Sequence, residues 1–229
     1  MIPSFIWLTF WLREDSIHPE PRWLIAAAFF GGILSVIAAV FAEKYIADIF
    51  SDQAPRFVSW LSNGNLRYAI WADVEEIVKI AAVAIIALNS RYNDEPIDAM
   101  VYCITVALGF AALENAFFIL SPLSQGHIIV GVTTGGLRFI GATLVHTVSA
   151  AMIGFSLGYA FYRGAISRIA IFICGITGAI ALHAFFNLSL VNSGGSTVDN
   201  LRTFAWIWAA VVIMIVLFEE IKAVKPKLN

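Results

Sequence analysis

Six ionisable or amide side chains lie within segments that are otherwise apolar enough to span a membrane. A charge near the centre of a bilayer costs about 2.5 kcal/mol or more, so such residues are functional candidates by default. Glutamate, histidine and asparagine together can move a proton, hold a metal ion or stabilise a developing negative charge. The candidate catalytic residues are Glu75, Glu76, Glu114, His146, His183 and Asn187.

The composition of the chain indicates a membrane protein. Of the 229 residues, 60% are hydrophobic and only 13% are charged, whereas soluble domains carry roughly 25% charged residues. The net charge of −2 gives no indication of a nucleic-acid partner. The two cysteines, Cys103 and Cys174, lie in apolar runs without metal-ligand spacing, so we expect them to pack. We therefore predict an all-α, polytopic bundle in a lipid bilayer, with one domain over residues 1–229.

Apolar stretches of about 20 residues predict six or seven transmembrane helices. The run Met1–Leu12 is too short to cross a bilayer alone, and we expect a short span or an interfacial helix there. We expect the glycine-rich segment Gly126–Gly136 to be a loop that dips partly into the membrane. The predicted spans are Trp23–Ala42, Tyr68–Leu88, Ala99–Leu120, Leu137–Phe161, Ile169–Val191 and Phe204–Phe218.

The candidate residues fall at similar depths in their predicted spans. Glu75 and His146 follow the starts of their spans, whereas Glu114 and His183 precede the ends of theirs. Because successive spans run in opposite directions, all four groups should lie roughly 9–14 Å below one surface at 1.5 Å per residue. The distribution of Lys and Arg near the helix ends favours a cytoplasmic C-terminus and puts this surface outside the cytoplasm. The sequence therefore predicts one intramembrane polar site.

The two adjacent glutamates differ in their spacing from Lys79 along the helix. Lys79 follows Glu75 by four residues and Glu76 by three, so it can pair with either across one helical turn. The two carboxylates point about 100° apart on a helix. We expect Glu75, with the better spacing, to pair with Lys79, and Glu76 to face the site as the catalytic base.

Three further spacings concern the other helices. His183 and Asn187 lie four residues apart and should share a helix face. Phe110 precedes Glu114 by four residues, so its ring should wall the site beside that carboxylate. Asn115 points elsewhere, and we expect it to support the site as a hydrogen-bond donor.

Two motifs resemble those of a known family. Glu75-Glu76-Ile-Val-Lys79 resembles the EExxK motif of the PrsW family of intramembrane proteases, and Gly109-Phe110-Ala-Ala-Leu-Glu114-Asn115 resembles its GFxxxEN motif. His146, and His183 with Asn187, fall on the two later helices where that family and the wider CAAX-protease and bacteriocin-processing superfamily place histidines. The HPEP segment around Pro19–Pro21 is similar to an element near the family's N-terminus. The resemblance extends from about Pro19 to Val191.

This resemblance implies an intramembrane endopeptidase that cuts a membrane-anchored protein substrate in the plasma or inner membrane of a prokaryote. The best-known role in the family is the first, extracytoplasmic (site-1) cut in an anti-sigma factor. The family is classed with metalloproteases, but superfamily members are also described as glutamate-dependent, without a metal. The resemblance therefore implies either no cofactor or Zn²⁺.

The residues leave both mechanisms open. Without a metal, a glutamate accepts the proton of water, and His183 and Asn187 donate to the oxyanion. With zinc, the ligands are His146, His183 and Glu114, with a position left open for water. The HExxH zinc signature is absent from the sequence, and we favour the metal-free mechanism.

Two functions of other classes stay open on the sequence. Intramembrane Glu and His also form proton relays in transporters, which usually carry internal repeats with a site at the bilayer midplane. No such repeat is evident in this sequence, and the predicted site lies nearer one surface. The alternatives are a proton-coupled transporter and a non-catalytic protein that binds membrane helices.

Overall fold

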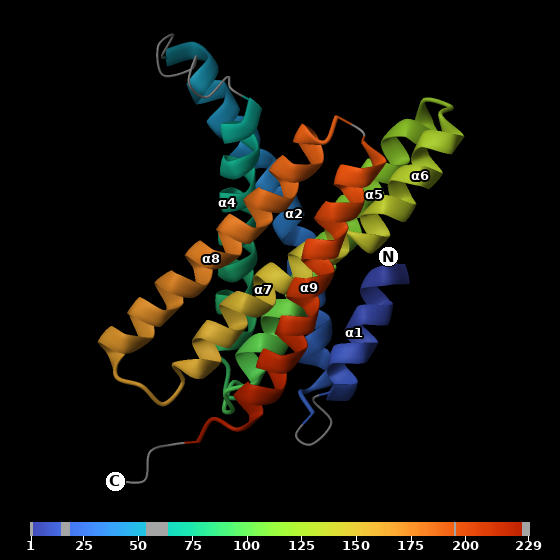
Figure 1. The fold of residues 1–229 in the computed structure, drawn as a ribbon. Helices are drawn as coiled ribbons and strands as arrows, with labels where there is room; N and C mark the ends of the chain where they lie inside the picture. The colour runs from blue at the N-terminus through green and yellow to red at the C-terminus, as the bar shows by residue number, and fades with distance from the viewer. Residues whose placement is uncertain (1, 15–18, 54–63, 195, 226–229) are drawn as a thin grey trace.

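A computed structural model of the chain describes residues 2–14, 19–53, 64–194 and 196–225, and all regular structure in these ranges is helical (Figure 1). The prediction of an all-α fold is therefore confirmed. The helices are α1 (Ile2–Glu14), α2 (Arg22–Gln53), α4 (Gly64–Val83), the π-helical turn η1 (Ala84–Leu88), α5 (Asp98–Ser124), α6 (Ile128–Ile140), α7 (Ala142–Tyr159), α8 (Ala165–Asn192) and α9 (Thr197–Lys222).

Five helical segments of the described chain are long and apolar enough to cross a membrane. They are Arg22–Ile49, Asp98–Ser124, Ile128–Tyr159, Ala165–Asn192 and Thr197–Lys222. The predicted span Tyr68–Leu88 corresponds to α4 with η1, which carries Asp73, Glu75, Glu76 and Lys79 and is more polar than these five. The architecture is thus a polytopic membrane bundle, and the number of six or seven spans stays a prediction.

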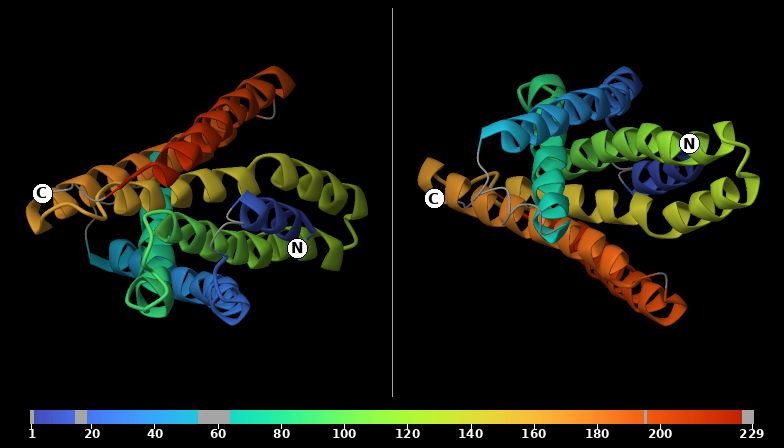
Figure 2. Two further views of the ribbon diagram at one scale, coloured as in Figure 1. Left: turned by 90° about the horizontal axis from the view of Figure 1, so that it is seen from below. Right: turned by 90° about the horizontal axis from the view of Figure 1, so that it is seen from above.

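Helix α5 forms the centre of the bundle. Every residue from Asp98 to Ala112 is buried, as expected for a helix that is apolar all round. In Figure 2, α5 and α7 lie side by side, with α2 on one side of this pair and α8 and α9 on the other. Helix α4 contacts both α2 and α8. The core therefore joins the four helices that carry the predicted site residues.

Two glycines explain how closely α2 and α5 approach. A Cβ atom added at Gly109 would lie 2.0 Å from the carbonyl oxygen of Phe29, and one added at Gly32 would lie 1.9 Å from that of Val106. Both distances are far below van der Waals contact, so each position excludes any side chain. Gly109, which opens the GFxxxEN motif, thus sets the distance between two helices.

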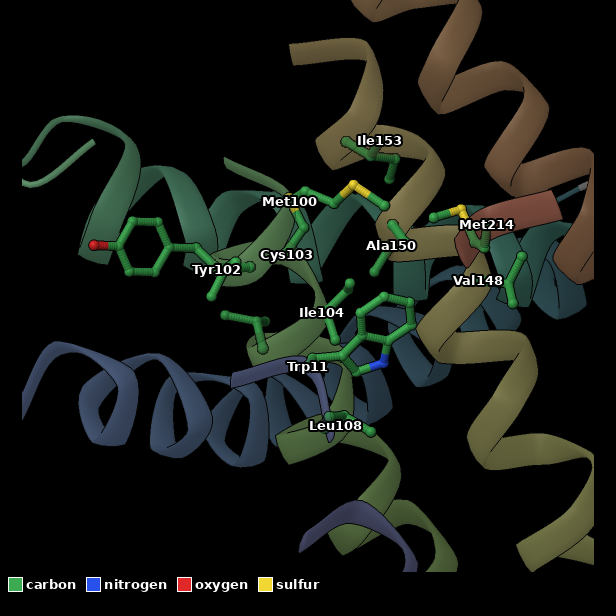
Figure 3. Packing of buried hydrophobic residues seen from close by; sticks show 14 of the residues in the cluster. Trp11, Met100, Tyr102, Cys103, Ile104, Leu108, Val148, Ala150, Ile153 and Met214 are labelled. Carbon is green, nitrogen blue, oxygen red and sulfur yellow. The ribbon is translucent and has the colours of Figure 1, made fainter. Parts of the chain in front are cut away.

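The helix α1 packs against the bundle through Trp11. Its indole is 2% exposed and lies 4.9 Å from the ring of Phe218 on α9, measured between ring centroids. Figure 3 shows Trp11 among the α5 side chains Ile104 and Leu108. This packing fixes the first helix of the chain to the core.

The structure corrects the prediction for Gly126–Gly136. Most of this segment belongs to the helix α6, which ends at Ile140, and α7 begins at Ala142. The predicted span Leu137–Phe161 is therefore interrupted at Gly141. A Cβ at Gly141 would lie 2.4 Å from the ring of Phe204 and 2.9 Å from that of Phe186. The glycine therefore allows these two rings to pack against the break.

Candidate active site

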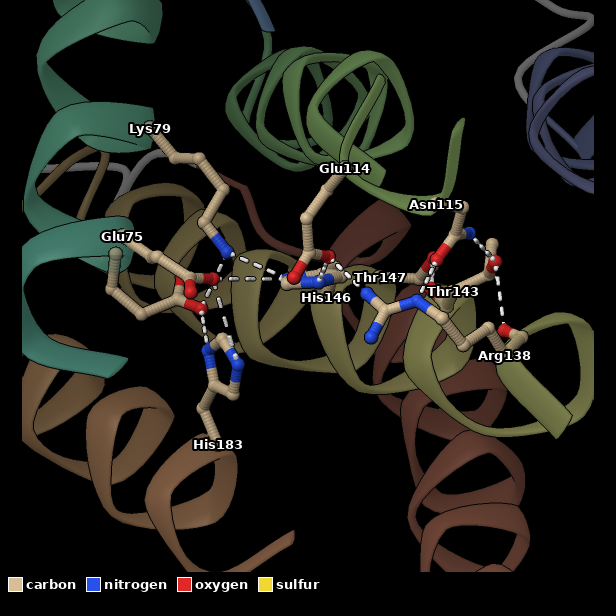
Figure 4. Close-up of polar contacts among 10 residues, drawn as sticks. Glu75, Lys79, Glu114, Asn115, Arg138, Thr143, His146, Thr147 and His183 are labelled. Atoms are coloured by element: carbon tan, nitrogen blue, oxygen red, sulfur yellow. Dashed lines mark hydrogen bonds and ion pairs between the residues drawn. The ribbon is translucent and has the colours of Figure 1, made fainter. Parts of the chain in front are cut away.

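Four helices bring the predicted polar residues together in one cluster. Figure 4 shows Glu75 and Lys79 from α4, Glu114 from α5, His146 from α7 and His183 from α8 pointing toward one another. The rings of His146 and His183 lie 4.9 Å apart between centroids and are nearly perpendicular. The predicted convergence of these side chains is therefore confirmed.

The first part of the cluster is a buried group of three side chains, Glu76 and Lys79 of α4 and His183 of α8. Lys79 Nζ donates to Glu76 Oε1 at 2.6 Å, and His183 Nδ1 contacts the same oxygen at 2.7 Å. A carboxylate that is paired with an ammonium group acts as an acceptor, so His183 Nδ1 carries the proton. The Nε2 atom of His183 is consequently the ring nitrogen that faces Glu75.

The second part joins α4, α5 and α7. His146 Nε2 lies 2.8 Å from Glu114 Oε2, and Lys79 Nζ lies 3.1 Å from His146 Nδ1. An ammonium group can only donate, so His146 Nδ1 is the acceptor and His146 Nε2 carries the proton. Each histidine therefore directs one N–H at a carboxylate and the other ring nitrogen into the cluster.

Glu75 lies between these two inward nitrogens. Its Oε2 is 3.7 Å from His183 Nε2 and 3.9 Å from His146 Nδ1. This oxygen is buried and has no hydrogen-bond partner among the described residues. One donor atom from each of Glu75, His146 and His183 lies within 4.8 Å of the others. Such a carboxylate with two imidazoles is a common ligand set for zinc.

The structure reverses the predicted pairing of the two adjacent glutamates with Lys79. Lys79 pairs with Glu76, three residues before it, and not with Glu75 as expected. The reason is a third partner: Glu76 Oε1 also accepts from His183 of α8, which fixes that carboxylate beside the lysine. Glu75 is left to face both histidines.

Glu114 also differs from its expected place. The sequence suggested Glu114 as the third zinc ligand beside His146 and His183, but Glu114 contacts the protonated, outer nitrogen of His146. Its Oε2 also lies 2.5 Å from Arg138 Nη2. The oxygen that accompanies the two inward nitrogens belongs to Glu75 instead.

A cavity of about 280 Å³ reaches the cluster from the side of α6–α9. Among the described residues that line it, Glu114 is the one carboxylate, and Glu75 and Glu76 do not line it. Asn187 lines this cavity together with His183, in agreement with their predicted common face. A molecule in the cavity would therefore meet the outer half of the cluster.

The predicted supporting residues take separate positions. Phe110 does not line the cavity beside Glu114; its ring centroid lies 4.9 Å from Lys79 Nζ and 5.3 Å from that of His146. Asn115 donates from Nδ2 to Thr143 Oγ1 at 2.9 Å and accepts from Arg138 Nε on Oδ1 at 2.6 Å. Both residues thus hold parts of the cluster in place.

Sequence reasoning missed Arg138 and Glu43. Arg138 was counted only for membrane orientation, yet it contacts Glu114 and Asn115 and lies over the ring of Phe118, with Cζ 3.9 Å from its centroid. Glu43 of α2 lies just beyond the predicted span Trp23–Ala42, and it interacts electrostatically with Glu75 and Glu114. Spacing within one helix does not reveal either residue, because each reaches the site from a helix other than those of its partners.

The cluster can carry an excess of negative charge. When its three carboxylates are ionised, the described part of the chain sets two fixed cations against them, Lys79 and Arg138. His146 is neutral when its Nδ1 accepts from Lys79, so it offsets none of the remaining negative charge. A divalent metal ion near Glu75 would compensate this charge where a buried carboxylate is otherwise costly.

Comparison with known proteins gives a family match for this chain. Residues 20–218 match the model of a family described as PrsW family intramembrane metalloprotease. The chain is 26% identical to the Protease PrsW of Bacillus subtilis (strain 168) over 188 residues, which are 82% of this chain and 79% of the relative. It is 28% identical to the Protease PrsW of Geobacillus kaustophilus (strain HTA426), over 69% of this chain and 63% of the relative.

A third relative, the Protease PrsW of Clostridioides difficile (strain 630), is 24% identical over 83% of this chain and 77% of its own length. No solved structure gives a significant match. The family match covers most of the chain and includes all of the cluster in Figure 4. The chain therefore belongs to the PrsW family of intramembrane metalloproteases.

Proposed function

We propose that this peptidase hydrolyses a peptide bond of a membrane-anchored protein and holds a divalent metal, Zn²⁺, through Glu75, His146 and His183. The observation that carries the proposal is the convergence of Glu75 Oε2, His146 Nδ1 and His183 Nε2. Membership of a protease family favours this function over the transporter and the non-catalytic helix-binding protein.

The donor atoms fit a zinc ion in type and nearly in spacing. Ligand atoms about 2.0–2.2 Å from a tetrahedral zinc lie roughly 3.3–3.6 Å apart, and two of the donor pairs here lie 3.7 and 3.9 Å apart. Ligation by His146 Nδ1 requires Lys79 to give up its hydrogen bond to that nitrogen, while its ion pair with Glu76 can remain.

The orientation of both histidines supports ligation. Metal-binding histidines usually donate their other N–H to a carboxylate, which fixes the tautomer and raises the basicity of the ligand. Glu76 accepts from His183 and Glu114 accepts from His146 in this way. These contacts are the reason for preferring the metal-dependent mechanism to the metal-free one that the sequence alone favoured.

A bound zinc ion would activate water and polarise the scissile carbonyl. The general base must reach that water from the substrate side, and Glu114 is the carboxylate that lines the cavity. Glu76 is fully buried and does not line the cavity, so it suits positioning and not proton transfer. We therefore move the role of base from Glu76 to Glu114.

Asn187 is the candidate donor to the oxyanion. It lines the cavity beside His183 and makes no side-chain hydrogen bond within the described part of the chain, so its amide is available to a substrate carbonyl. A positioned amide donor stabilises the charge that develops on the carbonyl oxygen. Arg138 holds the Glu114 carboxylate in the same cavity.

The substrate in this proposal is an anti-sigma-factor-like protein that is cut near the extracytoplasmic surface of a prokaryotic plasma membrane. The family resemblance supports this class of substrate, and the predicted depth of the cluster below that surface supports the place of the cut.

The test is proteolysis by the purified chain in proteoliposomes. A panel of single-span membrane peptides would be incubated with the wild type, the chelator-treated protein and the zinc-reconstituted protein. The proposal predicts cleavage that is lost on chelation and returns with zinc. Full cleavage after complete removal of zinc would contradict the metal-dependent mechanism, and cleavage that persists in Glu75→Gln would contradict this ligand set.

A further inference from the structure

The cavity beside the cluster has two chemically different parts. Its inner end is formed by Glu114, Arg138, His146, His183 and Asn187. The rest of its described lining is mostly apolar, with Ser193 and Asn200 as the polar members, and its apolar residues come from α6, α7, α8 and α9. The apolar lining residues are Leu137, Ala142, Val145, Phe186, Leu190 and Phe204.

We propose that this apolar part is the subsite for a large apolar side chain of the substrate, adjacent to the bond that is cut. The inference rests on the proposed function, because it takes the inner end of the cavity as the place of hydrolysis. Pockets that are mostly apolar with a few convergent polar groups are typical of binding sites. A cavity of about 280 Å³ has room for one such side chain beside the reacting carbonyl.

The shape of this subsite depends on the break between α6 and α7. Gly141 leaves space for the rings of Phe186 and Phe204, whose centroids are 6.5 Å apart. Phe204 is 8% exposed and Ala142 is 7% exposed, and both line the cavity. The small residue at position 142 leaves the pocket open, and the Phe204 ring limits its extent.

This arrangement predicts a preference for side-chain size. A hydrophobic pocket discriminates by about 1–3 kcal/mol per methylene, which corresponds to roughly 10–200-fold in kcat/KM. Wild-type protein should therefore prefer Leu or Phe over Ala at one of the two positions flanking the cut by at least about 10-fold. The opposite flanking position should show a smaller dependence on size.

The test uses two substitutions that change the pocket in opposite directions. The cut in one single-span membrane peptide is first located by mass spectrometry, and each flanking residue is then varied among Ala, Leu, Phe and Trp. Ala142→Leu fills the pocket and should shift the preference toward Ala by at least about 10-fold. Phe204→Ala enlarges it and should raise kcat/KM for Trp relative to Leu.

The readout is a ratio between substrates for one preparation of protein, so partial loss of folding does not change it. Trp206→Ala is the matched control, because Trp206 is on the same helix as Phe204, is 68% exposed and does not line the cavity. Its ratios should equal those of the wild type. If Ala142→Leu fails to fold, Phe204→Ala still carries the test.

The outcomes separate the subsite from the function on which it rests. Cleavage that requires Glu75, with identical side-chain preferences in wild type, Ala142→Leu and Phe204→Ala, would overturn the subsite and leave the peptidase mechanism standing. A zinc-loaded wild type that cleaves none of the peptides would contradict both. Opposite shifts in the two variants at the same flanking position would support both.

Discussion

Glu76 and Glu114 each contact one histidine of the site and one cation, but their surroundings differ. The pair of Glu76 with Lys79 is buried inside the bundle (the closed pair), whereas the pair of Glu114 with Arg138 borders a cavity (the open pair). Glu76 is 0% exposed and its cation Lys79 is 2% exposed, whereas the side chains of Glu114 and Arg138 are each 17% exposed. The closed pair suits fixed positioning of His183. The open pair can exchange a proton with water in the cavity as well as position His146.

The largest effect should follow from the open pair. Glu114→Gln keeps an acceptor for Arg138 but removes proton acceptance, so turnover should fall by about 10²–10⁴-fold, the usual contribution of a general base. Peptide cleavage with saturating zinc measures this loss. Wild-type turnover of Glu114→Gln at saturating zinc, with reduced turnover only at low zinc, would show that Glu114 only positions His146, and the two glutamates would then not differ in role.

The closed pair should give a smaller and different effect. Glu76→Gln weakens the acceptor that orients His183, and loss of such a carboxylate usually costs 10–100-fold in metal affinity or activity. Zinc titration followed by proteolysis should detect weaker binding, with activity restored by excess zinc. The comparison would be reversed if zinc failed to restore Glu76→Gln but restored Glu114→Gln.

Arg138 should have the smallest effect of the three. Arg138→Gln leaves Glu114 without its cation, and a positioning loss of about 1.4 kcal/mol would lower kcat by about 10-fold. Arg138→Lys should recover part of this loss because it keeps the charge. The matched control is Arg202→Gln, since Arg202 is 73% exposed and pairs only with Asp199 among the described residues.

An unchanged kcat in Arg138→Gln, with unchanged zinc content, would show that Glu114 does not depend on its pairing with Arg138. A fall in the folded fraction that equals the fall in kcat would assign Arg138 a purely structural role.

The sequence allowed prediction of the features that depend on position along single helices. Helical rise and alternating direction were enough to predict that Glu75, Glu114, His146 and His183 meet at one depth. Gly109 is part of a motif that the sequence shows. The reason that a glycine is needed there, the close approach of the Phe29 carbonyl on α2, appears only in the three-dimensional structure.

The features that were mispredicted depend on neighbours from other helices. A helical ion pair contributes only about 0.2–0.5 kcal/mol, so the better spacing of Glu75 is a weak preference. The contact of Glu76 with His183 of α8 outweighs it and decides which glutamate accepts from Lys79. Arg138 lies on α6, which was expected to be a loop over much of its length. Pairing of Glu114 with a cation from that segment could not follow from spacing within its own helix.

The metal content of purified protein tests the central claim most directly. Wild-type chain, His183→Ala and Asn187→Ala would be purified together, equilibrated with zinc and analysed for bound metal by mass spectrometry. Asn187 lines the same cavity but offers no imidazole, so it is the matched control. We predict about one zinc ion per chain in the wild type and in Asn187→Ala, and loss of the metal in His183→Ala. Equal zinc content in all three proteins, or none in an active wild type, would contradict a metal centre at Glu75, His146 and His183.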